Sequence, residues 1–324
     1  MNTVKPLRIL DQRPLAEAIL DEVSSGLHLR PKRLPSKFFY DAAGSALFEQ
    51  ICAQPEYYLT RAELEIMRMH AGAMAACLGP GVALIEYGSG SGLKTRLLLR
   101  ELADPTAYMP VDISRAALTA SGATLMRDFP ALQILPLCAD FTAGVKLPTP
   151  RQPVRRKVVY FPGSTLGNFE ARDAVRLLSQ MRVQIGRGGA ALIGIDLKKD
   201  RNLLEAAYND AAGVTAMFTL NMLARFNREL GADFNLARFR HRARYNDLAG
   251  RIETHIVSRV DQEVRIGVER FHFAADEMML VEYSCKYTLG EFVRLAAAAG
   301  LRVKRHWTDA AQRFSVQYLV PDEI

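Results

Sequence analysis

The sequence predicts an α/β fold in which helices cover both faces of a mostly parallel sheet, with a second domain formed by the remaining chain. Short apolar segments alternate with helical stretches through residues 61–196, the pattern of a parallel sheet. Several of these segments end in glycines or carboxylates, where open α/β sheets bind their ligands. We therefore expect a sheet domain of residues 61–196 plus 287–324, and a second domain of residues 1–60 plus 197–286.

The first predicted strand begins at Leu84, ends in Glu86, and is followed by glycines at positions 88, 90 and 92. Glycine adopts positive φ and lacks a Cβ, so its backbone can approach a ligand closely. A dinucleotide fingerprint would have its third glycine at position 93, where Leu93 stands. The spacing favours S-adenosylmethionine over a nicotinamide dinucleotide. A glycine-rich turn that binds nothing is the alternative for so short a motif.

The next two predicted strands argue against that alternative. The segment Ala107–Asp112 ends in a carboxylate 24 residues after Gly88, a position from which Asp112 can accept both ribose hydroxyls of a nucleoside. The segment Leu132–Cys138 leads to Asp140 and Phe141, an acid and an aromatic ring that suit an adenine. A lone Asp after a strand is more often a cap or turn former, but three ligand-type strand ends in order favour a nucleoside site.

Four further segments complete a predicted sheet of seven strands. Lys157–Phe161 and Ala190–Asp196 are apolar runs, separated by a helical stretch from Asp173 to Ile185. The short segments Leu301–Trp307 and Phe314–Leu319 then close the sheet near the carboxyl terminus.

The second domain has two informative segments. Residues 203–228 have the pattern of one helix containing Tyr208, and residues 278–287 alternate as a strand. In such a strand Glu282 and Ser284 share one face, where they form an acceptor pair for an N–H-bearing ring or a cation. An exposed sheet face with ordinary polar residues is the alternative.

The net charge of +7, from 42 basic and 35 acidic residues, is concentrated in residues 151–157 and 238–244. Neither cluster interleaves aromatic residues in a pattern typical of nucleic-acid binding. We expect these clusters to be solvated surfaces, and we expect no nucleic-acid partner.

No apolar run approaches the ~18 residues of a membrane span, and the first twenty-five residues lack the basic start and apolar core of a secretory signal. Four scattered cysteines without a C-x-x-C pair predict neither a zinc site nor a disulfide framework. We expect a cytoplasmic monomer with reduced thiols, no bound metal and no membrane association.

Over nearly its whole length the chain resembles the S-adenosylmethionine-dependent L-histidine Nα-methyltransferases of ergothioneine biosynthesis. Each matching run would be weak alone, but their order across both predicted domains is specific. The runs are Lys37–Asp41, Pro55–Tyr58, Glu86–Ser91, Lys94–Arg96, Pro162–Asn168, Tyr208–Thr215 and Glu282–Lys286.

The resemblance implies a Rossmann-like, seven-stranded class I methyltransferase sheet with a second α+β domain that binds the substrate. It further implies that S-adenosylmethionine is the co-substrate and that three methyl transfers convert L-histidine into hercynine. The residues that would contact S-adenosylmethionine are Gly88, Lys94, Asp112, Asp140 and Phe141.

The resemblance also assigns substrate roles to Tyr57, Gly163, Asn168, Tyr208, Glu282 and Ser284. Tyr208 and Asn168 would meet the carboxylate and the α-amine, whereas Glu282 and Ser284 would meet the imidazole. Tyr40 and Phe48 would line the methyl-transfer region. Tyr40 and Asn168 are the candidate catalytic residues, since one offers a hydroxyl and the other can orient the amine.

The segment Arg251–His255 departs from the family pattern, because Thr254 follows Glu253 where the relatives usually have methionine. A shorter, hydroxyl-bearing side chain expected near the imidazole could alter ring selectivity. Histidine remains the first choice because Glu282 and Ser284 are kept. The alternatives are an Nα-methyltransferase for another amino acid such as tryptophan, a protein or nucleic-acid methyltransferase, and a sensor that binds both ligands without catalysis.

Overall fold

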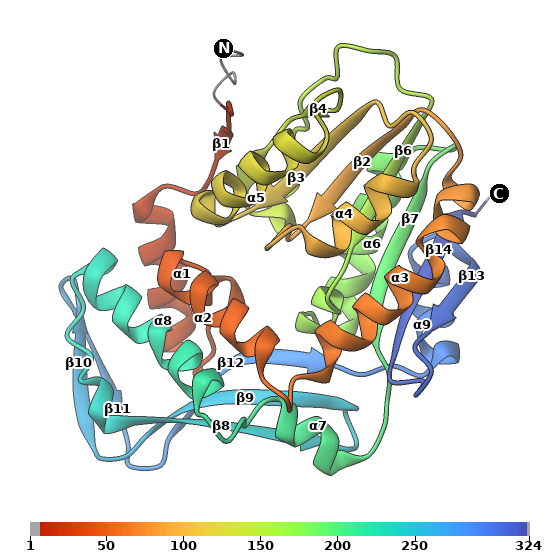
Figure 1. Cartoon of the computed structure of the whole chain (residues 1–324). Helices are drawn as coiled ribbons and strands as arrows, with labels where there is room; N and C mark the ends of the chain where they lie inside the picture. Colours follow the sequence, from red (N-terminus) through yellow and green to blue (C-terminus); the bar gives the residue numbers. More distant parts are fainter. Residues whose placement is uncertain (1–6, 323–324) are drawn as a thin grey trace. The chain divides into compact units, whose positions relative to one another are not determined.

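The computed structural model describes residues 7–322, and the chain divides into two compact units (Figure 1). The sheet unit comprises the chain up to Arg13, Leu59–Lys198 and the chain from Lys286 onward. The inserted unit comprises Pro14–Tyr58 and Lys199–Cys285. Each unit is therefore assembled from segments that lie far apart in the sequence.

Within the described residues the sheet unit contains a nine-stranded sheet of order β1-β5-β3-β2-β6-β7-β14-β13, with β4 paired to β3. The strands are β1 (Leu10–Gln12), β2 (Val82–Tyr87), β3 (Ala107–Asp112), β4 (Gln133–Ile134), β5 (Leu137–Ala139), β6 (Arg156–Phe161), β7 (Ala190–Asp196), β13 (Leu301–Thr308) and β14 (Phe314–Pro321). Strand β14 pairs antiparallel with both β7 and β13, whereas the other pairs of this sheet are parallel. The seven predicted strand regions all lie in this sheet, and the predicted α/β, Rossmann-like class is confirmed.

Two details of the sheet differ from the prediction. The segment expected as one strand forms β4 and β5, because Pro136 has no N–H to donate to a continuous ladder. The short strand β1 pairs in parallel with β5, and Leu10 N donates to Pro136 O over 3.0 Å. The predicted boundaries placed residues 1–60 in the second domain, whereas β1 belongs to the sheet.

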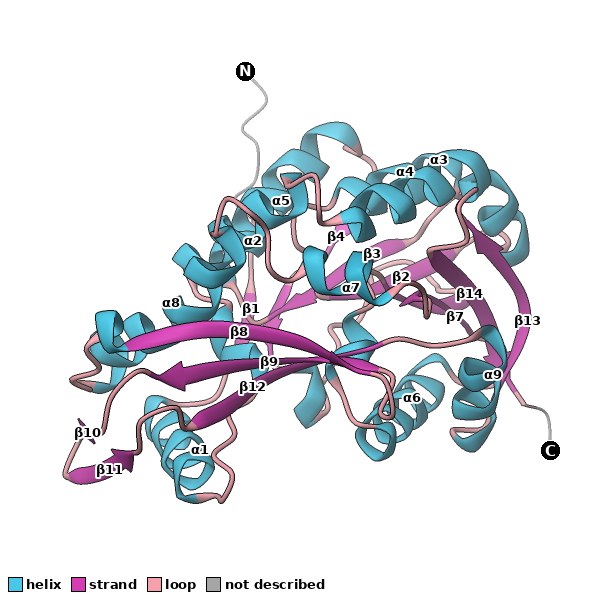
Figure 2. Cartoon of the chain, turned by 90° about the horizontal axis from the view of Figure 1, so that it is seen from below, coloured by secondary structure: helices cyan, strands magenta, loops and turns pink. Residues whose placement is uncertain are grey.

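Helices cover both faces of this sheet (Figure 2). On one face lie α3 (Tyr58–Leu78), α4 (Leu93–Glu101) and α5 (Arg115–Asp128), and on the other lie α6 (Ala171–Ile185) and α9 (Leu289–Ala298). The helix α6 buries Ala174, Leu177, Leu178, Met181 and Ile185, an apolar stripe at helical spacing. This stripe and Phe292 of α9 belong to one hydrophobic core with the strands. The packed sheet therefore provides a rigid base for the loops at its strand ends.

The inserted unit contains a three-stranded antiparallel sheet of order β12-β9-β8 and a two-stranded hairpin, β10-β11. The strands are β8 (Phe239–Asn246), β9 (Arg251–Ser258), β10 (Gln262–Ile266), β11 (Glu269–Phe273) and β12 (Met278–Cys285). Its helices are α1 (Ala16–His28), α2 (Ala42–Ala53), α7 (Arg201–Ala207) and α8 (Val214–Leu230). Short 3₁₀ turns are η1 (Ser36–Phe39), η2 (Phe141–Ala143), η3 (Thr165–Asn168) and η4 (Leu236–Arg238), of which η2 and η3 lie in the sheet unit.

The single helix expected over residues 203–228 is two helices separated by a turn. Asp210 accepts hydrogen bonds from Val214 N at 2.7 Å and Thr215 N at 2.8 Å, which satisfies amides that the start of α8 would leave unpaired. Gly213 precedes the helix with a φ of +73°, which glycine adopts without steric cost. As a consequence Tyr208 ends α7 and lies in the turn rather than on a helix face.

Candidate active site

The glycine-rich turn after β2 has the backbone that its sequence predicts. Gly88, Gly90 and Gly92 have φ values of +75°, +46° and +66°. A Cβ built on Gly88 or Gly90 would meet no atom within 4 Å, so open space lies beside both. Gly92 immediately precedes α4. The turn therefore offers partly exposed backbone at Gly88 and Gly90 beside the start of a helix, an arrangement that fits the amino-acid end or ribose of S-adenosylmethionine.

Asp112 at the end of β3 is tied to this turn. Its carboxylate accepts from Ser114 N at 2.8 Å and from Gly90 N at 3.4 Å. Burial raises the pKa of Asp112 above its ordinary value, while these backbone N–H groups oppose the shift. Because a carboxylate has about four acceptor sites, Asp112 can hold the loop and still accept ribose hydroxyls.

Asp140 and Phe141 follow β5. Asp140 caps the turn η2 by accepting from Thr142 N at 2.9 Å and Thr142 Oγ1 at 2.5 Å. The Phe141 ring stacks on Tyr87 with a centroid distance of 5.2 Å and an interplanar angle of 4°. Its edge contact to Phe161 has a centroid distance of 5.5 Å. Phe141 is thus held in a fixed orientation next to the strand that precedes the glycine turn.

Lys94 contacts a residue that the sequence analysis did not identify. Its Nζ lies 2.5 Å from Oε2 of Glu63, a fully buried carboxylate of α3. The same carboxylate accepts from Gly163 N at 2.9 Å. Glu63 stands three and four residues before Ile66 and Met67, which are both buried. This spacing places Glu63 on the apolar face of α3, and that was the signal that could have revealed it.

Glu86, two residues before the glycine turn, is a second buried carboxyl group. It accepts from Thr95 Oγ1, which lies 2.7 Å from both carboxyl oxygens, and from the hydroxyl of Tyr108. Burial raises the pKa of Glu86 to about 8, although the hydrogen bonds from Tyr108 and Thr95 oppose the shift. At neutral pH the group is therefore mostly protonated, and it links β2, β3 and α4 beneath the turn.

The loop after β6 carries the other expected residues of the sheet unit. Gly163 has a φ of +76° and Ser164 one of +59°. The Ser164 side chain accepts from Asp196 N at 2.9 Å, which holds this strained turn against the end of β7. Asn168 is the last residue of η3. Glu63, Gly163 and Lys94 are therefore brought together, and Asn168 lies five residues further along the same loop.

The inserted unit gathers the expected aromatic residues. The ring of Phe48 makes edge contacts with Tyr40 at 5.7 Å and with Tyr57 at 6.2 Å between centroids. Tyr57 in turn contacts Tyr208 at 6.2 Å. Burial raises the pKa of Tyr57 well above its ordinary value, and the charges of Tyr208, Tyr40 and Glu282 raise it further. Tyr57 is therefore a neutral phenol at neutral pH.

Tyr208 is fixed at both its ends. Its hydroxyl lies 2.6 Å from Ser284 Oγ, and its carbonyl oxygen lies 2.9 Å from Nε2 of His241. Burial lowers the pKa of His241, so the imidazole is neutral and can donate to that carbonyl. His241, which the sequence analysis did not select, thus positions the turn that carries Tyr208.

Thr254 and Glu282 lie opposite each other in the pairing of β9 with β12. The Thr254 side chain is 1% exposed, and its hydroxyl has no hydrogen-bond partner within residues 7–322. A buried hydroxyl without a partner is costly. A polar atom of a bound ligand would remove that cost. A buried hydroxyl of this kind is expected where a polar substrate binds.

The expected residues fall into two groups. The sheet unit holds Gly88, Lys94, Asp112, Asp140, Phe141, Gly163 and Asn168, and the inserted unit holds Tyr40, Phe48, Tyr57, Tyr208, Thr254, Glu282 and Ser284. In the part of the chain that the structure describes, no group of three or more His, Cys, Asp or Glu side chains could hold a metal ion. Across the same residues, no helix has the length and apolar character needed to cross a membrane.

Part of the basic surface has structural partners. Arg156 of the first cluster donates to the carbonyl oxygens of Cys77 and Leu78 at the end of α3, at 2.8 and 3.0 Å. In the second cluster Arg244 pairs with Glu205 at 3.2 Å and Arg240 with Asp276 at 3.1 Å. Three of the clustered arginines therefore have hydrogen-bond or ion-pair partners within the fold.

Comparisons with known proteins agree with this geometry. The chain is 41% identical over 311 residues to a histidine N-alpha-methyltransferase of Mycolicibacterium smegmatis, covering 94% of this chain and 95% of that protein. It is 40% identical over 305 residues to the protein of the same name from Mycobacterium tuberculosis, covering 92% and 94%. The ergothioneine biosynthesis protein 1 of Neurospora crassa is 31% identical over 285 residues, which is 86% of this chain and 32% of that longer protein.

A family model described as "Histidine-specific methyltransferase, SAM-dependent" matches residues 19–321. The match spans both units, including the glycine turn of one and the Tyr208–Ser284 contact of the other. The chain therefore belongs to the family of S-adenosylmethionine-dependent, histidine-specific methyltransferases.

Proposed function

We propose that the enzyme trimethylates the α-amino group of L-histidine to give hercynine, a step of ergothioneine biosynthesis. The observation that carries the proposal is a set of polar side chains in the inserted unit. Ser284 lies in contact with Tyr208, and Glu282 stands opposite the unpartnered hydroxyl of Thr254. A half-buried carboxylate and two buried hydroxyls suit an imidazole, since the N–H of the ring can donate to a carboxylate and the other ring nitrogen can accept from a hydroxyl.

The inserted unit is, in this proposal, the substrate-binding domain, and the sheet unit binds S-adenosylmethionine. Gly88 would approach the amino-acid end of the co-substrate, Asp112 the ribose, and Asp140 with Phe141 the adenine. Lys94 would pair with the carboxylate of S-adenosylmethionine. The open space beside Gly88 and the N–H groups already turned to Asp112 support these roles.

For the amino acid, Tyr208 and Asn168 would hold the carboxylate and the α-amine, together with Tyr57 and Gly163. Glu282, Ser284 and Thr254 would hold the imidazole. Tyr40 and Phe48 would line the region of methyl transfer, where their ring contact leaves an apolar wall. Such a wall excludes water from the reacting atoms.

The reaction is an in-line displacement in which the neutral amine attacks the methyl carbon as the carbon–sulfur bond breaks. S-adenosylhomocysteine leaves, and the first and second products lose a proton from nitrogen before the next transfer. Tyr57 is a poor base for that proton, because a phenol whose pKa is raised stays protonated. Tyr57 would therefore act as a hydrogen-bond donor, water would take the proton, and alignment would supply most of the catalysis.

The test is mass spectrometry of the products after the purified chain is incubated with S-adenosylmethionine and each of the twenty amino acids separately. Monomethylhistidine and dimethylhistidine are included as intermediates. Trimethylhistidine formed from histidine, and from both intermediates, supports the proposal. A methylated product from tryptophan or another amino acid would instead indicate a pocket altered around Thr254.

The remaining expectations belong to the same proposal. The enzyme would act as a cytoplasmic monomer on a free amino acid, with no nucleic-acid, membrane or metal partner. Absence of product from every amino acid, despite binding of both ligands, would favour a sensor. Salt-sensitive retention on RNA or DNA would favour a macromolecular substrate, because phosphate contacts weaken steeply with ionic strength.

A further inference from the structure

Glu63 joins two loops that the proposed function assigns to different ligands. Its Oε2 lies 2.5 Å from Lys94 Nζ, in α4 just after the glycine turn. The same oxygen accepts from Gly163 N at 2.9 Å, and Oε1 lies 3.2 Å from that nitrogen. One carboxylate therefore fixes a side chain at the start of α4 and a backbone amide in the loop after β6.

The fold reserves space for this carboxylate. Glu63 is 0% exposed, and a Cβ on Gly194 of β7 would fall 2.6 Å from its Oε1 and 3.0 Å from Cζ of Phe314. Any side chain larger than hydrogen at position 194 would therefore displace the carboxylate or the Phe314 ring. A buried charge is costly unless it is paired and hydrogen-bonded, and Lys94 with Gly163 meets that condition.

We propose that Glu63 is a positioning residue that acts through Lys94. Glu63 would hold the Lys94 ammonium where the carboxylate of the bound co-substrate can meet it. Through its hydrogen bond from Gly163 N, Glu63 would also hold the Gly163 loop in a fixed position relative to Lys94. An ammonium has three N–H donors, so Lys94 can bond Glu63 and the carboxylate of S-adenosylmethionine together. The inference rests on the proposed role of Lys94 in binding the co-substrate.

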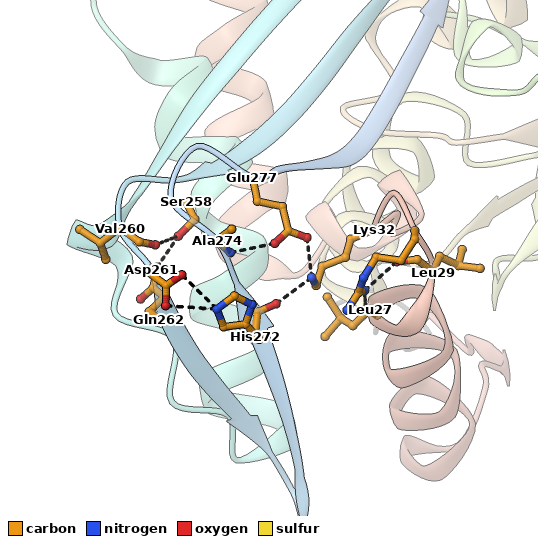
Figure 3. A network of polar contacts seen from close by, with 11 residues as sticks. Leu27, Leu29, Lys32, Ser258, Val260, Asp261, Gln262, His272, Ala274 and Glu277 are labelled. Carbon is orange, nitrogen blue, oxygen red and sulfur yellow. Dashed lines mark hydrogen bonds and ion pairs between the residues drawn. The ribbon is translucent and has the colours of Figure 1, made fainter.

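A purely structural ion pair is the competing explanation, and the inserted unit provides a matched example (Figure 3). Lys32 Nζ lies 2.5 Å from Glu277 Oε1 and 2.8 Å from the carbonyl oxygen of His272. Lys32 is 1% exposed, and its ammonium lies 4.6 Å from the centroid of Phe273. The Glu277 side chain pairs with Lys32 and accepts from Ala274 N at 2.9 Å, and neither partner is an expected site residue.

The experiment is a double-mutant cycle on the full chain, with S-adenosylhomocysteine as the probe and titration calorimetry as the readout. Glu63→Gln keeps the size of the side chain and an acceptor for Gly163 N, but removes the charge that holds Lys94. We expect Glu63→Gln and Lys94→Gln each to raise the Kd about tenfold. The double variant should be no more than about twofold weaker than Lys94→Gln alone, because coupled residues are not additive.

Two further variants separate positioning from folding. Glu277→Gln should lower the melting temperature, as we also expect for Glu63→Gln, but leave the Kd for S-adenosylhomocysteine unchanged. Glu63→Asp keeps the charge on a shorter side chain, so it should restore part of the affinity that Glu63→Gln loses. A thermal melt of each variant verifies that the binding data come from folded protein.

The inference is overturned if Glu63→Gln binds the probe as tightly as the unmodified chain, or if its effect adds in full to that of Lys94→Gln. Unchanged binding by Lys94→Gln would overturn it as well. These outcomes are separate from those of the proposed function, because the probe contains no histidine. Positioning by Glu63 would stand even if histidine were not methylated, and histidine could be methylated without it.

Discussion

The hydroxyl of Tyr208 lies 2.6 Å from Oγ of Ser284, joining the turn between α7 and α8 to the strand β12. Both hydroxyls are buried, and His241 holds the same turn from the other side through the carbonyl of Tyr208. On the same strand, Glu282 stands two residues before Ser284 and opposite Thr254 of β9. The polar residues proposed for histidine are therefore fixed by secondary structure before any ligand binds.

Tyr208→Phe removes the hydroxyl and leaves Ser284 Oγ without this partner. Since a buried hydrogen bond contributes about 1 kcal/mol, we expect kcat/KM for histidine to fall about fivefold and the melting temperature to fall by a few degrees. Ser284→Ala should have a similar effect, and the double variant should be little worse than either single one. Fully additive losses in steady-state kinetics would show that the two hydroxyls act independently.

Glu282→Ala should cost histidine turnover far more than co-substrate binding. A hydrogen bond to a charged group contributes about 1.5–3 kcal/mol, so we expect kcat/KM for histidine to fall about 100-fold. The Kd for S-adenosylhomocysteine should change less than about twofold, because the residues proposed to bind the co-substrate lie in the sheet unit.

The control for this variant is Glu253→Ala on the neighbouring strand. Glu253 pairs with Arg251 at 2.9 Å and has no role in the proposed site, so its removal should leave histidine kinetics unchanged. Equal losses of turnover and co-substrate binding in Glu282→Ala would contradict the assignment of Glu282 to the imidazole.

Thr254→Val should separate folding from substrate binding. The substitution keeps the shape of the side chain but removes a buried hydroxyl that has no partner in the described residues. A buried unsatisfied group costs about 1–3 kcal/mol, so the free enzyme should melt at a higher temperature. Histidine should bind more weakly if the hydroxyl contacts the ring, and calorimetry with S-adenosylhomocysteine present would measure this. Unchanged histidine affinity would place Thr254 outside the imidazole contacts.

Glu86→Gln should change how stability depends on pH. The folded-state pKa of about 8 lies above the ordinary value of 4.5, so the folded protein binds the proton more tightly than the unfolded chain does. Stability from this group is thus complete below pH 4.5 and is lost as pH rises through about 8. Glutamine mimics the neutral acid, so the variant should lose less stability than the unmodified chain between pH 6 and 9. Urea unfolding at both pH values tests this, and parallel losses would refute it.

The sheet and the backbone of its glycine-rich turn could be predicted because local sequence determines them. Strands of a parallel sheet are continuous apolar runs, and the glycines at positions 88, 90 and 92 have the positive φ that motivated the prediction. Asp112 likewise ends β3 as expected. The break at Tyr208 was missed because the apolar period continues through it. The capping of α8 by Asp210 overrides that period.

The supporting residues were harder to predict because their partners are distant in the chain. Glu63 meets Gly163 across a separation of 100 residues, and His241 meets Tyr208 across 33. A charged residue in a helix and a polar residue in a strand are usually solvent-exposed, so residue type alone singles out neither, and only Glu63 has a local signal in its spacing to Ile66 and Met67. The pairing of β1 with β5 was likewise not predictable, because Leu10–Gln12 is too short to show a strand pattern and its partner strand is distant in the chain.

The most direct test of the central claim is where the methyl groups are placed on the product. Purified enzyme, L-histidine and S-adenosylmethionine carrying a ¹³C-labelled methyl group would be followed by NMR until the reaction is complete. We predict that one resonance from three equivalent methyl groups on the α-nitrogen will accumulate, with both ring nitrogens unmodified. Methyl groups on the imidazole, or no label on histidine, would contradict the account.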